Sequence, residues 1–205
     1  MTGSAMRWNI AWFVATAIGL VVGGVMFHFP GSFGELSWQP VALVFGVIIG
    51  FVTGLFVGLA QWAALLLRRR AGMRLLLWMA TGIAVTHGLN DGAPWSIGNL
   101  VLSLACGLGM AAGYAAFLDE RRPIPLLLVG LGWAGALLAA KYGIRVLPLP
   151  EEETPAAWAT AHGAESLIVA VVWGVVTVIA GVPARLRADL PALPPPAIVA
   201  EEATA

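Results

Sequence analysis

The sequence is poor in charged residues, and this shortage indicates which solvent surrounds the chain. Only 11% of its 205 residues are Asp, Glu, Lys or Arg, whereas soluble domains carry about 25%. Apolar residues make up 60% of the chain, and the mean hydropathy is +0.88. Eleven basic residues balance eleven acidic ones, so no basic field exists to recruit nucleic acid, and we expect no such partner. The composition instead predicts the lipid bilayer as a partner.

Several signatures of catalysis are also missing. The single cysteine, Cys106, excludes an intramolecular disulfide. No glycine loop ends in the Lys-Ser or Lys-Thr pair of a phosphate site, and no Gly-x-Ser-x-Gly turn presents a nucleophile. Ionisable residues are absent from the centres of the long apolar runs, which argues against pumps and proton-coupled carriers because both depend on such groups. We therefore expect no enzymatic activity and no cofactor, with one metal-dependent alternative given below.

Long apolar runs are what the sequence has in abundance. Crossing a bilayer takes roughly 20 apolar residues as a helix, and proline-containing breaks separate six such runs. The third is the weakest, because its short core ends in Thr86, His87 and Asn90. After residue 183 the chain is rich in proline, so we expect a bundle domain over 1–183 and a disordered tail over 184–205. The predicted fold is an all-α polytopic membrane bundle of about six transmembrane helices, near 8–28, 41–67, 73–89, 97–118, 124–142 and 165–182.

Basic residues are distributed unevenly over the connections between these runs. If all six runs cross a membrane, nine basic residues fall on one side, and only Lys141 and Arg145 fall on the other. Loops rich in Lys and Arg stay in the cytoplasm, so we predict an N-in, C-in topology. The nine are Arg7, Arg68, Arg69, Arg70, Arg74, Arg121, Arg122, Arg185 and Arg187.

The second run carries a glycine at every fourth position, which places the four on one face of a helix. Small residues at this spacing let the backbones of membrane helices approach closely. We expect the stripe to pack against a helix of the same chain, with a homo-oligomer or a membrane-protein partner as the alternative. The stripe consists of Gly46, Gly50, Gly54 and Gly58, and matching small faces occur at Ala15, Gly19 and Gly23 of the first run and at Ala105, Gly109 and Gly113 of the fourth.

The stripe runs into the segment Gly-Leu-Ala-Gln-Trp-Ala-Ala-Leu-Leu-Leu-Arg-Arg-Arg, from Gly58 to Arg70. This segment resembles a signature of uncharacterised bacterial multi-pass membrane proteins, in which a glycine-zipper helix ends in Gln-Trp and paired arginines. The resemblance covers one helix and its turn. It implies the bacterial cytoplasmic (inner) membrane and carries no activity. Gln61 and Trp62 lie in the apolar zone, and the Gln61 amide needs a partner there: either another helix, or a bound ligand or lipid.

The three histidines lie at the predicted outer ends of helices. His28 ends the first helix, His87 ends the third, and His162 opens the sixth, with Glu165 three residues later. Three imidazoles and a carboxylate suffice as ligands for zinc or another transition metal. No local metal-binding motif is present, so the alternative is a set of water-accessible histidines without a shared role.

Three functions follow from these observations. The first is a non-enzymatic accessory or scaffold bundle that binds other membrane helices or lipid, because packing surface is abundant. The second is a channel or facilitator for a small neutral solute, suggested by Gln61 and by a weak repeat of residues 58–77 in residues 109–128. The third is a metal-dependent membrane enzyme with an outer site at His28, His87, His162 and Glu165.

Overall fold

The fold is all-α, as the sequence predicts. The computed structural model describes residues 3–27, 40–92, 98–148 and 154–188, and no strand occurs within these ranges. The helices are α1 (Gly3–Phe27), α2 (Pro40–Leu65), α3 (Arg69–Gly92), α4 (Asn99–Leu118), α5 (Pro123–Gly143), the 3-10 helix η1 (Ile144–Val146), α6 (Pro155–Ile179) and α7 (Val182–Ala188).

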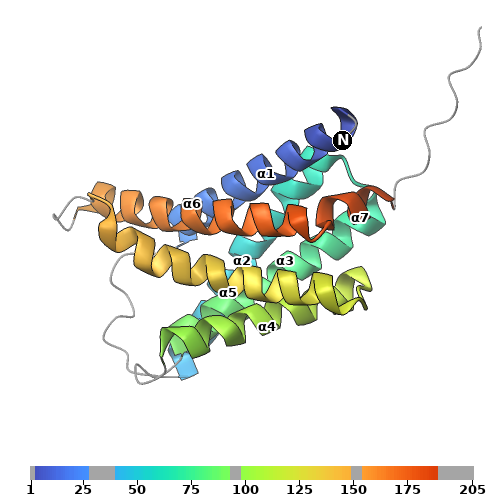
Figure 1. Cartoon of the computed structure of the whole chain (residues 1–205). Coiled ribbons are helices and arrows are strands. Elements are labelled where there is room, and N and C mark those ends of the chain that lie inside the picture. The colour runs from blue at the N-terminus through green and yellow to red at the C-terminus, as the bar shows by residue number, and fades with distance from the viewer. Residues whose placement is uncertain (1–2, 28–39, 93–97, 149–153, 189–205) are drawn as a thin grey trace, which may run out of the picture.

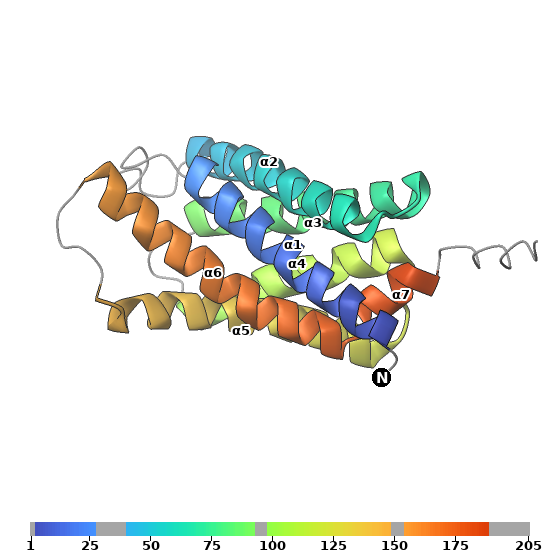
Figure 2. The same ribbon diagram turned by 90° about the horizontal axis from the view of Figure 1, so that it is seen from above.

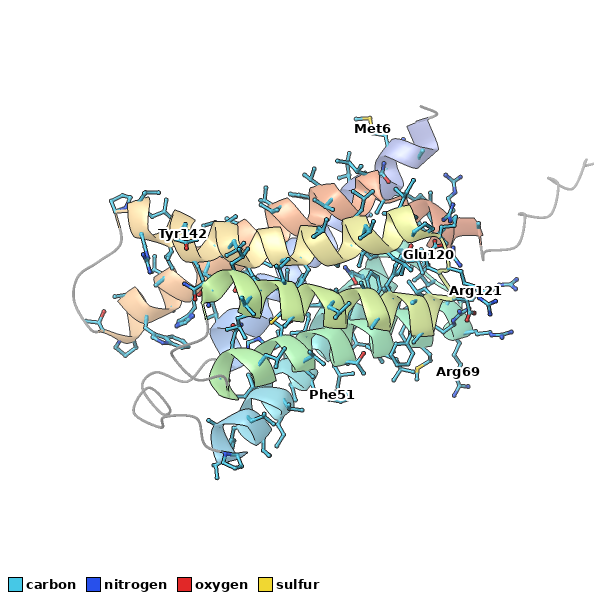
Figure 3. The ribbon with its side chains drawn as sticks, turned by 60° about the horizontal axis from the view of Figure 1, so that its bottom comes forward. Met6, Phe51, Arg69, Glu120, Arg121 and Tyr142 are labelled. Atoms are coloured by element: carbon cyan, nitrogen blue, oxygen red, sulfur yellow. The ribbon has the colours of Figure 1, made fainter. Side chains whose placement is uncertain are left out.

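The six long helices form a closed ring (Figures 1 and 2). Each packs against its neighbours in sequence, and α1 closes the ring on α6, while the short α7 lies against α1 and α6. Figure 3 places Arg69, Glu120 and Arg121 at one end of this ring and Tyr142 at the other. We call the first the arginine end and the second the pocket end, after a pocket that lies toward it. The turns that follow α2 and α4 therefore lie at the same end.

Five of the described helices are long and apolar enough to cross a membrane: α1, α2, α4, α5 and α6. Their outward faces carry large exposed apolar side chains such as Ile48, Leu108 and Ile179. These helices indicate a multi-pass membrane protein. Helix α3 is not among the five, although it has 24 residues, because polar residues lower its hydropathy. It packs between α2 and α4. Because α3 is not one of the five candidate spans, a count of six spans stays a prediction.

The glycine stripe of α2 lies against α3. A Cβ atom would lie 2.7 Å from the His87 carbonyl oxygen at Gly46, 2.5 Å from that of Ile83 at Gly50, 2.4 Å from that of Met79 at Gly54, and 2.9 Å from the Leu76 Cα at Gly58. The first and fourth helices, which offer matching small faces, are therefore not the partners of this stripe. The hairpin between α2 and α3 decides the pairing, because the short turn between Leu65 and Arg69 forces the two helices together.

The other small faces are also used within the chain. Gly19 and Gly23 of α1 lie against Val57 and Thr53 of α2, on a different face from the stripe. Gly109 of α4 lies against Val85 of α3. The packing surface that first suggested an external helix partner is thus largely occupied inside the ring.

The two main departures from the predicted boundaries are the start of α6 and the segment after residue 183. Helix α6 begins at Pro155, ten residues before the predicted start, because the Thr154 hydroxyl caps it by accepting a hydrogen bond from the Ala157 N–H at 3.1 Å. His162 and Glu165 therefore lie within the helix instead of at its opening. Residues 182–188 form α7, although we expected 184–188 in a disordered tail, and Leu186 is buried against the ring. The rest of that tail, 189–205, lies outside the described residues.

Candidate polar pocket

A pocket of about 110 Å³ lies inside the ring toward the pocket end. Five helices line it: α1, α2, α3, α5 and α6. The His162 and Glu165 side chains remain 28% and 37% exposed, so the pocket communicates with the surface. Its polar lining consists of Thr53, Thr86, His87, Asn90, Asp91, His162, Glu165 and Ser166, and its other lining residues are Leu20, Gly24, Ile83, Trp133, Leu137 and Val169.

The structure brings three of the four predicted metal-site residues to this pocket. His87 comes from α3, and His162 and Glu165 come from α6, where the His162 Nδ1 lies 3.7 Å from a Glu165 carboxylate oxygen. His28 lies outside the described residues. Within the described part of the chain, no three His, Cys, Asp or Glu residues are grouped closely enough to hold a metal ion. The pocket lining includes two carboxylates, Asp91 and Glu165, but the described residues do not assemble a metal site.

Aromatic residues separate the pocket from the arginine end. Trp133 lines the pocket and donates from its indole N–H to the Thr86 hydroxyl at 2.8 Å. Trp173 lies edge-on to Trp133 at 5.0 Å between ring centroids and 6.1 Å from Trp78, whose ring is 4.8 Å from Tyr114. All four rings are buried. In this conformation the pocket is a dead end, because this aromatic cluster fills the interior beyond it.

The hydroxyl of Thr53 sets this residue apart from the other helical threonines. Thr53 is 2% exposed and lines the pocket, yet its Oγ1 has no hydrogen-bond partner among the described residues. A buried hydroxyl costs free energy unless it is hydrogen-bonded, and in a helix it commonly donates to the carbonyl four residues earlier. Five other threonines do this: Thr16, Thr81, Thr86, Thr160 and Thr177. The Thr53 hydroxyl is therefore an unsatisfied buried polar group on a residue that lines the pocket.

Gln61 and Trp62 lie away from the pocket, toward the arginine end of α2. The Gln61 side chain is buried, and its Nε2 donates to the Thr16 hydroxyl of α1 at 2.8 Å. The Trp62 indole N–H donates to the Leu67 carbonyl at 2.8 Å, and its ring covers Gly72. The Gln61 Oε1 has no hydrogen-bond partner among the described residues. The interhelical hydrogen bond thus accounts for the amide nitrogen alone, and both interpretations given for Gln61 stay predictions.

A buried carboxylate at the arginine end was not anticipated. Glu120 is 2% exposed and accepts from Arg122 Nε at 3.0 Å, from Arg122 Nη2 at 2.8 Å and from Arg185 Nη1 at 2.6 Å. Hydrogen bonds from the Arg122 guanidinium are the main reason that the pKa of this carboxyl falls to about 2, against the opposing effect of burial. Arg185 belongs to α7, so the cluster ties that helix to the turn after α4. No local sequence signal distinguishes this glutamate from a solvated one.

Asp119 strengthens the same turn. It ends α4 in the left-handed conformation, with φ of 50°, and its carboxylate pairs with Arg74 of α3. The Glu120 cluster and this ion pair thus join α3, α4, α5 and α7. Their cations, Arg74, Arg122 and Arg185, belong to the nine basic residues that defined the predicted inner side.

No protein-family model matches the chain, and no curated protein or solved structure matches it either.

Proposed function

We propose that this chain is a multi-pass membrane protein that binds a small polar solute in the pocket between its helices, without catalysing a reaction. One observation carries the proposal: five helices line a single pocket within an otherwise apolar ring, and α2, α3 and α6 contribute polar residues to it. Small-molecule sites are concave, largely apolar and provided with a few convergent polar groups. The unpartnered Thr53 hydroxyl fits such a site.

The depth of Glu165 supports the same proposal. At about 1.5 Å per residue, Glu165 lies roughly 20 Å along α6 from its end at Ile179, and the hydrocarbon core of a bilayer is about 30 Å thick. Because α6 starts at Pro155, the Glu165 carboxylate lies within a candidate spanning helix instead of at its predicted opening. Ionisable groups within spans are costly and usually mark a functional site.

We further propose six spans with the arginine end in the cytoplasm, so that the pocket opens to the outer face. Helix α3 supports this count, since it starts at the arginine end and its residues Asn90 and Asp91 reach the pocket. The positive-inside rule then assigns the arginine turns to the cytoplasm. We propose the cytoplasmic membrane of a bacterium as its location, and the resemblance of Gly58 to Arg70 to bacterial multi-pass proteins supports this proposal.

The alternatives have less support. A scaffold role rested on free packing faces, and the glycines of these faces are occupied inside the ring. A channel or facilitator for a neutral solute needs a continuous path, and the aromatic cluster interrupts it. A metal-dependent enzyme needs a third ligand close to His162 and Glu165, which the described residues do not provide. Solute binding requires only the pocket as it stands.

Binding to purified protein tests this proposal. In lipid nanodiscs, a panel of small amines, alcohols, sugars and carboxylates should contain at least one compound that raises the melting temperature and binds by calorimetry. Thr53→Val, which removes the hydroxyl at nearly constant shape, should weaken that binding about tenfold, the equivalent of one hydrogen bond of about 1.4 kcal/mol. Thr160→Val is the matched control, because Thr160 is on the exposed face of α6 and does not line the pocket. A panel without any binder, or equal effects of the two variants, would contradict the proposal.

A further inference from the structure

An apolar groove lies on the outer surface of the ring, between α4 and α5. Its leucine walls face outward, and Leu108, near the middle of α4, is 72% exposed. The groove follows α4 over residues 104–115, which is about 16 Å at 1.5 Å per residue. The hydrocarbon core of a bilayer is about 30 Å thick, or about 15 Å per leaflet. The groove is therefore about as long as the hydrocarbon part of one leaflet.

Small residues produce this groove. The two helices approach most closely at Gly107, where a Cβ would lie 2.3 Å from the Gly130 carbonyl oxygen. From this contact toward the arginine end, Ala111 and Ala115 leave the space between the helices unfilled. The groove holds about 550 Å³, and since a cavity of about 150 Å³ holds benzene, it has room for roughly 20 carbon atoms. Its described lining consists of leucine, alanine, glycine and proline alone, so it suits a hydrocarbon chain.

The groove opens at the arginine end beside an arginine that has no counter-ion. Pro123, the first residue of α5, lines the groove, and Arg121 precedes it by two residues, which span at most about 7 Å. Arg121 is exposed, and within the described part of the chain it has no ion pair or hydrogen bond. Its guanidinium therefore presents a free positive charge at the mouth of the groove.

The surroundings of Arg121 leave this charge uncompensated. Asp119 and Glu120, the carboxylates of this turn, are already paired with other arginines. The α5 N-terminus begins after Arg122, whose side chain makes no capping hydrogen bond, so the partial positive charge of the helix start adds to the field. A second copy of the chain would bring the same paired carboxylates to this depth. An anionic phospholipid brings a phosphate, which arginine binds well.

We infer that an anionic phospholipid binds to this face, with its phosphate at Arg121 and one acyl chain in the groove between α4 and α5. One molecule thus fills an apolar groove as long as a leaflet and supplies the anion that the mouth lacks. The groove shares no described lining residue with the polar pocket. The inference is therefore independent of the solute that the pocket binds.

Native mass spectrometry of the unmodified protein tests the lipid class. The protein is released from mixed micelles that hold equal amounts of dioleoyl phosphatidylglycerol and dioleoyl phosphatidylcholine, which differ only in the headgroup. Phosphatidylglycerol should be retained about fivefold more strongly, the equivalent of about 1 kcal/mol from one basic side chain near an anionic headgroup. Equal retention of the two lipids would overturn the inference. A lipid-free dimer would also overturn it, in favour of a second copy in the groove.

A charge variant then locates the headgroup. Arg121→Gln should lower the retention of phosphatidylglycerol about fivefold and remove its advantage over phosphatidylcholine. Arg69→Gln is the matched control, because Arg69 is an exposed arginine at the same end, on α3, and does not line the groove (Figure 3). It should leave the preference unchanged. Equal losses in the two variants would indicate diffuse attraction to a basic surface and would overturn the site.

A second variant locates the acyl chain. Ala112 lines the groove and is exposed, so Ala112→Trp should fill the groove without disturbing the contacts between helices. It should lower the retention of phosphatidylglycerol about tenfold, because the chain loses apolar surface to pack against. Ala116→Trp is the matched control, since Ala116 is also exposed on α4 but does not line the groove. Full retention in Ala112→Trp, or equal losses in both tryptophan variants, would overturn the placement of the chain.

Discussion

Replacing Gly54 by alanine should destabilise the protein by about 2–3 kcal/mol, the cost of overpacking a tight contact. The added Cβ would lie 2.4 Å from the Met79 carbonyl oxygen and 2.5 Å from the Ala80 Cα. These are backbone atoms of α3, so no side chain can rotate away and the two helices must separate. The effect exceeds the gain of about 1 kcal/mol in helix propensity from replacing glycine. Thermal unfolding in mild detergent measures it.

Gly135→Ala is the matched control for this prediction. Gly135 is also inside a long helix, α5, but a Cβ there would meet no atom within 4 Å. The control should be neutral or slightly stabilising, because only the helix propensity changes. A Gly54→Ala variant as stable as Gly135→Ala would show that α2 and α3 are not in backbone contact along this stripe.

Glu120→Gln should be the second large effect, lowering the free energy of unfolding by about 2 kcal/mol at neutral pH. Hydrogen bonds between charged groups contribute about 1.5–3 kcal/mol, and glutamine keeps the shape but loses the charge that Arg122 and Arg185 contact. Release of Arg185 should also loosen α7 from the arginine end. Chemical unfolding of both proteins in the same detergent at pH 7 gives the difference, and Asp119→Asn, an exposed position, should have a smaller effect.

The pH dependence gives an independent check on Glu120. Its pKa falls to about 2 in the folded protein, below the usual value of about 4.3 for an unfolded chain. Its contribution is therefore fully present above about pH 4.5 and is lost as the pH falls toward 2. The difference in melting temperature between the unmodified protein and Glu120→Gln should shrink over that window. A difference that stays constant down to pH 2.5 would mean that Glu120 is not ionised in the cluster.

Much of the helical framework was predictable, because apolarity and proline alone define most of the runs. The predicted 41–67, 97–118 and 124–142 match α2, α4 and α5 to within two residues at each end. The early start of α6 escaped the apolarity criterion because residues 155–164 are rich in alanine and contain His162. Alanine favours helix through low conformational cost and adds little hydropathy. A criterion based on apolarity therefore missed this part of the helix.

The contacts between helices were less predictable than the helices. The glycine stripe that includes Gly54 predicts a close approach to another helix. Which helix this is depends on the short turn between α2 and α3. The burial of Glu120 depends on Arg185, far along the chain, so no local pattern reveals it. For the pocket, a shared depth grouped His87, His162 and Glu165, and all three line it. The place of Thr53 in the pocket could not be inferred from the sequence. It is distinguished only by its hydroxyl, which does not form the usual hydrogen bond to a carbonyl of its own helix.

The most direct test of the account is the side of the membrane from which the pocket is reached. Cys106, the only cysteine, is buried, so the unmodified protein serves as the blank for a small, membrane-impermeant methanethiosulfonate reagent. Added to intact bacterial cells, the reagent should modify Ser166→Cys in the pocket and leave Arg121→Cys untouched until the membrane is permeabilised. Modification of both positions from the same side, or of Ser166→Cys only after permeabilisation, would contradict a pocket that opens opposite the arginine turns.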